Sequence, residues 1–297
     1  MKTAANWTVI VIALFCSILM FLLIKPFLLS GTGTFGPTVL QSQSPGPAVV
    51  ALLVALATCT VIATLVSRVL TSRNFLLDAS VRPHESVTGS NVTGTSLLII
   101  GIGLGWTCLQ LESIQTVVLD GSVMLLAFEG LSWGVALLIM ASIVLRFGGD
   151  FVNPMQNDDG STDDWALSNA SIKLAACGAC VLPVVWLVAQ SPLKGQVVIA
   201  TTLGAMAAGL VARLVAPTVQ PVLLFPAVCV FGALGQWVVG LTLPDNPSAL
   251  VAAGRLPNLI LPLPIDYAAG ALIGIPIGIS WGNGFIEKQD AANAASA

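Results

Sequence analysis

Eight long apolar segments run through this chain and restrict what it can fold into. Each approaches the length that one helix needs to cross the hydrocarbon core of a bilayer, about 20 residues. Only 8% of the 297 residues are charged, against about 25% in a soluble domain. In lipid, backbone polar groups must be satisfied within helices or closed barrels, so we predict an all-α polytopic transmembrane bundle. The predicted spans lie near 7–24, 48–67, 96–111, 122–145, 172–189, 196–216, 221–243 and 267–286.

The distribution of lysine and arginine orients these spans. With the N-terminus inside, eight basic residues fall on the cytoplasmic side and three on the outer side, as the positive-inside rule requires. We therefore predict a single integral domain over residues 1–297, in the plasma (inner) membrane, with both termini cytoplasmic. The cytoplasmic set is Lys2, Arg68, Arg73, Arg82, Arg146, Lys173, Arg213 and Lys288, and the outer set is Lys25, Lys194 and Arg255.

Three segments between the spans stand out. The stretches 68–95 and 146–171 are polar and are predicted to be cytoplasmic loops. The stretch 243–265 is apolar, yet it contains five prolines. Proline lacks the backbone N–H and clashes with the preceding helical turn, so this stretch cannot be a regular helix throughout. It lies either at the outer interface or inside the membrane as a re-entrant segment shielded by protein.

A row of glycines at four-residue spacing occupies the last span. Small residues at this spacing let another helix approach closely in lipid. The row therefore predicts packing within the chain, for example against the third span and its glycines, or alternatively a homo-oligomeric seam or a pore lining. Pro276 interrupts the row and is expected to kink the helix. The packing residues are Gly270, Gly274, Gly278 and Gly282 in the last span, with Gly101 and Gly105 in the third.

Three polar side chains are candidates for an intramembrane site. Glu129 has apolar sequence on both sides within the fourth span, and a carboxylate at that depth must be paired, protonated or in contact with water. It points to proton, cation or polar-substrate handling, or to a structural hydrogen bond between helices. Gln236 is a second buried polar candidate. Asp266 stands at the start of the last helix. It either caps this helix or provides a polar group at the mouth of a pathway.

Catalytic chemistry has little support in the sequence. Cys177 and Cys180 form a CxxC motif, a weak indication of a redox pair. His84 is the only histidine, so a histidine-based metal site or a Ser-His-Asp triad is excluded. We predict no metal and no cofactor. No basic cluster indicates nucleic acid.

Three classes of function remain open. The first is a non-enzymatic membrane component, either a scaffold or a subunit of a membrane complex. The second is a secondary transporter or channel that uses Glu129 and the glycine-rich last helix. The third is a membrane thiol redox protein that uses Cys177 and Cys180. The expected partners are the lipid bilayer and either a second copy or another membrane protein bound through a small-residue helix face.

Overall fold

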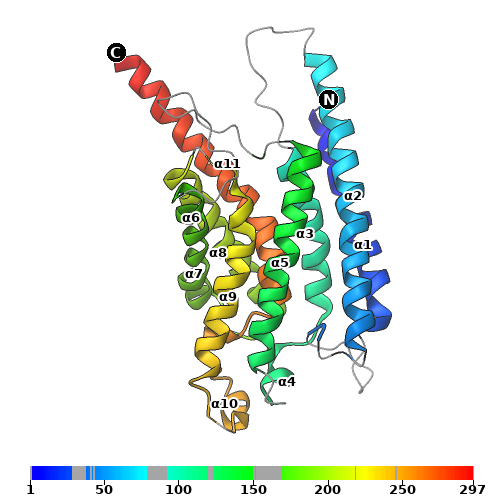
Figure 1. Cartoon of the computed structure of the whole chain (residues 1–297), viewed down its shortest axis with the longest axis vertical. Coiled ribbons are helices and arrows are strands. Elements are labelled where there is room, and N and C mark those ends of the chain that lie inside the picture. Colours follow the sequence, from blue (N-terminus) through cyan, green and yellow to red (C-terminus); the bar gives the residue numbers. More distant parts are fainter. Residues whose placement is uncertain are drawn as a thin grey trace.

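The computed structural model describes residues 2–28, 38–40, 42, 44–78, 92–119, 123–149, 151, 169–217, 219–244 and 246–296. All regular structure within these ranges is helical. Eight helical segments there are long and apolar enough to cross a membrane, and Figure 1 shows how the helices are arranged. The prediction of an all-α bundle with eight membrane-spanning helices is confirmed at this level.

The helices follow one another along the chain with short connections between most neighbours. Those before residues 152–168, which lie outside the described ranges, are α1 (Lys2–Ile24), η1 (Lys25–Phe27), α2 (Pro45–Asp78), α3 (Val92–Gln110), α4 (Ile114–Leu119) and α5 (Val123–Gly148). Those after it are α6 (Asn169–Ala176), η2 (Cys177–Cys180), α7 (Val181–Val188), α8 (Lys194–Val215), η3 (Pro221–Leu223), α9 (Leu224–Gly240), α10 (Ser248–Ala252), η4 (Asn258–Ile260) and α11 (Pro264–Ser296).

Two helices continue ten or more residues past the ends of their predicted spans. The predicted span in α2 ends at 67, but the helix continues to Asp78. The first part of the stretch predicted as a loop, 68–95, is therefore helical. The spanning part of α11 ends at Ile286, and the helix continues to Ser296. The extension of α2 contains no glycine or proline between 66 and 78, and α11 contains none after residue 284. No strong helix breaker therefore interrupts either extension.

The fifth span is not one regular α-helix. It consists of α6, the short 3₁₀ segment η2 and α7. Pro183 has no N–H to donate to the carbonyl one turn earlier, which interrupts the α-helical ladder at η2. Gly178 in η2 lies against α9, and a Cβ there would come 2.9 Å from the Cβ of Ala227. The interruption thus coincides with a close helix contact.

The proline-rich stretch 243–265 divides into an exposed half and a buried half. The short helix α10 lies at the end of the bundle opposite the termini (Figure 1). From Leu256 the chain turns into the bundle, and every residue from 261 to 272 is buried. The second half of the stretch is therefore shielded by protein, and α11 begins inside the bundle.

The last helix of the chain is at the centre of the molecule. α11 packs against α8, α3, α9 and α5, whereas α1 packs mainly against α2 and α3 at one edge. The N- and C-terminal ends of the described chain lie at the same end of the bundle (Figure 1). This arrangement agrees with an even number of spans, and the cytoplasmic location of that end stays a prediction.

Candidate functional site

The start of α11 holds a buried ion pair. The carboxylate of Asp266 is fully buried, and Lys194 Nζ at the start of α8 lies 3.1 Å from its Oδ2. The same oxygen accepts a hydrogen bond of 2.8 Å from the backbone N–H of Leu263, the residue before the helix. A carboxylate at the third helical position that binds this N–H is one half of a capping box. Asp266 therefore both caps α11 and joins it to α8.

Side chains from three other positions satisfy the irregular backbone before and within the first turn of α11. Gln236 Nε2 donates to the carbonyl of Pro262 at 2.5 Å. Thr201 Oγ1 donates to the carbonyl of Asp266 at 2.9 Å, and Cys108 Sγ approaches the carbonyl of Ile265 at 3.5 Å. Non-helical backbone is tolerated at membrane depth only when protein or water satisfies it. These contacts from α9, α8 and α3 serve that purpose here.

The glycine row packs against α8. A Cβ at Gly270 would come 2.7 Å from the backbone and hydroxyl of Thr201. A Cβ at Gly274 would overlap the carbonyl oxygen of Thr202, and one at Gly278 would overlap that of Met206. The contacts advance along both helices in the same direction, so α8 and α11 run parallel.

The two predicted packing glycines of α3 do not contact α8; they face another side of α11. Gly101 of α3 faces α11 on a different side, since a Cβ there would come 2.8 Å from Leu272 and Ile273. Gly105 has only an ordinary contact, 3.5 Å to Ile273. The third span thus contacts α11 through its own glycine, while the row itself faces α8.

A second polar contact joins the end of α8 to the end of the spanning part of α11. Arg213 Nε donates to Asn283 Oδ1 at 2.6 Å, and its Nη1 donates to the carbonyl of Pro217 at 2.5 Å. Gly282 leaves room for the stem of this arginine, because a Cβ there would come 2.8 Å from the Cβ of Arg213. The pair of helices is therefore held at both ends by charged side chains and between them by glycine contacts.

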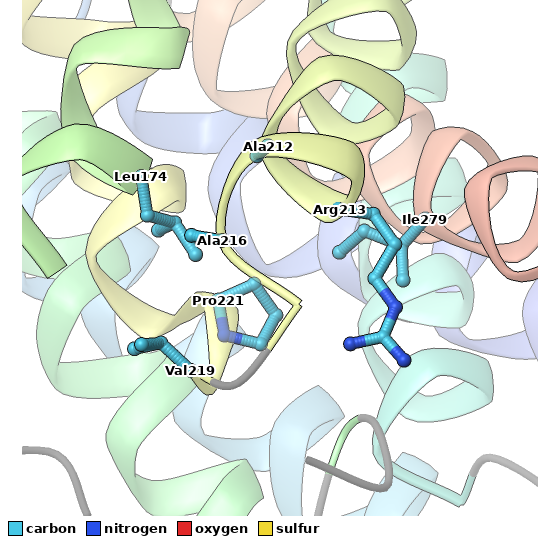
Figure 2. Close-up of a pocket in the computed structure, with 7 residues that line it drawn as sticks. All are labelled: Leu174, Ala212, Arg213, Ala216, Val219, Pro221 and Ile279. Atoms are coloured by element: carbon cyan, nitrogen blue, oxygen red, sulfur yellow. The ribbon is translucent and has the colours of Figure 1, made fainter. Parts of the chain in front are cut away.

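A small pocket lies beside Arg213, as Figure 2 shows. Its free volume of about 10 Å³ is near the minimum that one water molecule requires. This pocket is too small for an organic ligand. Apart from the arginine its lining is apolar, with Leu174, Ala212, Ala216, Val219, Pro221 and Ile279.

Glu129 is buried on α5, near the segment 38–40 that precedes α2. The side chain is 3% exposed, and neither carboxylate oxygen makes a hydrogen bond of regular geometry with the described residues. Four donors nevertheless face it: the Thr38 hydroxyl, the backbone N–H groups of Val39 and Leu40, and the Trp133 indole. Such surroundings suit a hydrogen-bond acceptor, so the carboxylate is placed to hold this segment against α5.

The predicted polar residues do not form one cluster. Asp266 lies in the first turn of α11, and Gln236 of α9 reaches the backbone just before that helix, at Pro262. Glu129 belongs to a separate contact with residues 38–40. Two further buried polar atoms in the described part lack a hydrogen bond, Gln236 Oε1 and Tyr267 Oη.

Cys177 and Cys180 occupy the two ends of η2. Both are free thiols, and Cys177 Sγ donates to the carbonyl of Lys173 at 3.2 Å. In a 3₁₀ turn, residues three apart lie on the same side, so the two thiols share a face. Their redox activity stays a prediction. Within the described ranges, no group of three or more His, Cys, Asp and Glu side chains is arranged to hold a metal ion.

Sequence reasoning missed Lys194 and Arg213 as partners of the last helix. Both were counted only among the basic residues that set the orientation of the spans. A signal did exist for Lys194, because it is the first residue of α8 and a cation at a helix N-terminus opposes the helix dipole unless an anion compensates it. Arg213 carried no comparable signal, since a cation in the last turn of a helix is favourable by itself.

Comparisons with protein-family models, curated proteins and solved structures gave no match for this chain.

Proposed function

We propose that this chain is a non-enzymatic component of a membrane assembly, a subunit or scaffold in the plasma (inner) membrane. The observation that carries the proposal is the continuation of α2 and α11 past the predicted spans 48–67 and 267–286 at one end of the bundle (Figure 1). With a rise of about 1.5 Å per residue, the residues from 68 to Asp78 and from 287 to Ser296 add about 17 Å and 15 Å of helix. Short helices gain most of their stability from packing, so these extensions are suited to dock on a second polypeptide.

The α8–α11 pair supports a static role for the bundle. Lys194–Asp266 and Arg213–Asn283 fix the two ends of the pair, and the glycine row fills the middle. Interfaces packed backbone to backbone do not slide continuously, because interiors at this density have no room for intermediate positions. A partner would accordingly bind the helical extensions, and the glycine row would serve the internal contact.

Affinity capture in a mild detergent from native membranes tests this function. We expect the full chain to migrate on a sizing column with a second polypeptide in a constant ratio across the peak. A variant that ends after Ile286 should lose that polypeptide while it keeps the thermal stability of the spanning bundle. A full chain that purifies only as a monomer or homo-oligomer from native membranes would refute the proposal.

Glu129 supports a second candidate function, transport of protons or cations. A carboxylate that is buried within a membrane span is the kind of group that proton relays use. If the chain transports these ions, reconstituted vesicles will show a flux that Glu129→Gln abolishes and Glu112→Gln leaves intact. Equal, background-level flux with and without the protein excludes this candidate.

A further inference from the structure

Two cysteines from separate helices meet inside the bundle. Cys16 belongs to α1 and Cys59 to α2, and both side chains are fully buried. Cys59 Sγ donates to the carbonyl oxygen of Cys16 at 3.6 Å, and the two thiols are also hydrogen-bond partners of each other. The pair lies within the spanning parts of both helices, Ile10–Phe27 and Pro45–Leu65. Reading the sequence alone does not reveal this pair, because 43 residues separate the two positions.

Small side chains let α1 and α2 approach closely around this pair. Ala13 lies one turn before Cys16, and Ala55 and Ala63 lie one turn before and after Cys59; all three are buried. Small residues at helical spacing are the usual means of bringing two backbones together in lipid. A disulfide requires closely spaced backbones, and here Cys59 Sγ lies 3.6 Å from the carbonyl oxygen of Cys16.

The other four cysteines lie in different surroundings. Cys108 Sγ is directed to the backbone of Ile265, and Cys229 is buried on α9. Cys177 and Cys180 belong to one short segment, so a bond between them would join no two helices. The contact between Cys16 and Cys59 is thus the one in which oxidation would link separate spans.

We propose that Cys16 and Cys59 are a dithiol–disulfide site within the membrane whose oxidant is a lipid-soluble quinone. In the reaction two S–H bonds break and one S–S bond forms. The quinone takes up the two electrons and two protons and leaves as the quinol. This inference is independent of the proposed role in an assembly, because it concerns the contact between α1 and α2 alone.

The surroundings of the pair select an apolar oxidant. Neither sulfur is accessible to water, and the neighbouring face of α1 exposes Leu14, Phe15 and Ile18. An oxidant must therefore arrive through lipid. α1 is the least buried of the eight spans, with 28% of its spanning part buried, so a small outward movement of this helix opens the pair. The disulfide would then fix this loosely embedded helix to α2.

The positions of the methionines allow a direct test on the full chain. Cyanogen bromide cleaves after Met20 and Met124, so Cys16 falls in fragment 2–20, and Cys59 and Cys108 fall in fragment 21–124. The reconstituted protein is treated with a short-chain quinone, unfolded, alkylated, cleaved without reductant and weighed by mass spectrometry. We expect fragment 2–20 joined to fragment 21–124 and released by reductant, with both alkyl adducts lost.

Serine variants identify the sulfur atoms involved. The linked product should persist in Cys108→Ser and be lost in Cys16→Ser and Cys59→Ser, each of which differs from the parent by a single atom. Full alkylation of Cys16 and Cys59 in the quinone-treated parent protein overturns the proposal. So does an equal yield of linked fragments in Cys59→Ser, because the bond would then involve Cys108.

Discussion

Gly274 and Gly278 lie directly against the backbone of α8, and neither position has room for one methyl group. Gly284 belongs to the same helix but has nothing within 4 Å of the position of a Cβ. Whether a position in this helix requires glycine therefore depends on whether it faces the backbone of another helix. Four-residue spacing alone identifies the face of the helix, but it does not distinguish a glycine that is required from one that is free.

Replacement of Gly278 by alanine tests this requirement. The added methyl group would overlap the Met206 carbonyl oxygen, and overpacking of this kind costs about 1–3 kcal/mol. We expect a lower melting temperature in detergent for Gly278→Ala. The matched variant Gly284→Ala should melt at or slightly above the temperature of the parent, because alanine favours helix and meets no neighbour. Equal melting of both variants would contradict the backbone contact.

The two ends of the spanning part of α11 are fixed to α8 by different kinds of contact. At the start of α11, Lys194 pairs with a carboxylate that has no access to water, while the lysine itself stays 12% exposed. Near the end of the spanning part, Arg213 binds the amide oxygen of Asn283. Since α11 begins inside the bundle on an irregular segment, its position depends on these side chains and on Gln236, in addition to the apolar burial that fixes an ordinary span.

Replacing the lysine and replacing the aspartate of the ion pair should lower the melting temperature by different amounts. Lys194→Met leaves a fully buried carboxylate with only the Leu263 N–H, and breaking a buried pair from one side costs about 3–5 kcal/mol. Asp266→Asn keeps an acceptor for that N–H, and the partly exposed lysine can reach water. We therefore expect Lys194→Met to lower the melting temperature more than Asp266→Asn does.

Two controls complete this comparison. Lys173→Met removes an exposed lysine of α6 and should change the melting temperature little, since exposed charges contribute at most about 1 kcal/mol. The double variant with Lys194→Met and Asp266→Leu should recover part of the loss, because no buried charge remains. If the loss of stability in the double variant equals the sum of the losses in the two single variants, the two side chains do not interact.

At the scale of the whole molecule, the last segment of the chain is its central helix. α11 contacts α8, α3, α9 and α5, while the first helix lies at the edge. The bundle can therefore reach its final packing only after the last span has entered. Eight spans also bring both termini to one end, with α10 at the other (Figure 1).

Cysteine labelling tests the predicted orientation. In intact cells a membrane-impermeant maleimide should modify Ala253→Cys, which follows α10 and is exposed. It should modify Ser296→Cys, at the end of α11, only after the membrane is permeabilised. The native thiols give a low background, because five are buried and the sixth is partly buried. The reverse pattern would place the termini outside and refute the orientation inferred from lysine and arginine.

The helices were predictable from sequence where local composition decides the outcome. Lipid requires long apolar helical runs, so the eight spans can be read one at a time. The prolines between 243 and 265 likewise excluded a continuous helix there. The extensions of α2 and α11 were missed, because a hydropathy argument ends a span where polar residues begin, whereas a helix ends only at a breaker or an unfavourable contact.

The sequence by itself determined the class of this protein, the number of its spans and the helix face on which close packing is needed. Only the tertiary structure decided that this face meets α8, that Lys194 pairs with Asp266, that Glu129 faces residues 38–40 and that Cys16 meets Cys59. The reason is physical. Burial in lipid depends on the composition of one segment, whereas each of these contacts depends on which distant segments pack side by side and on the register between them.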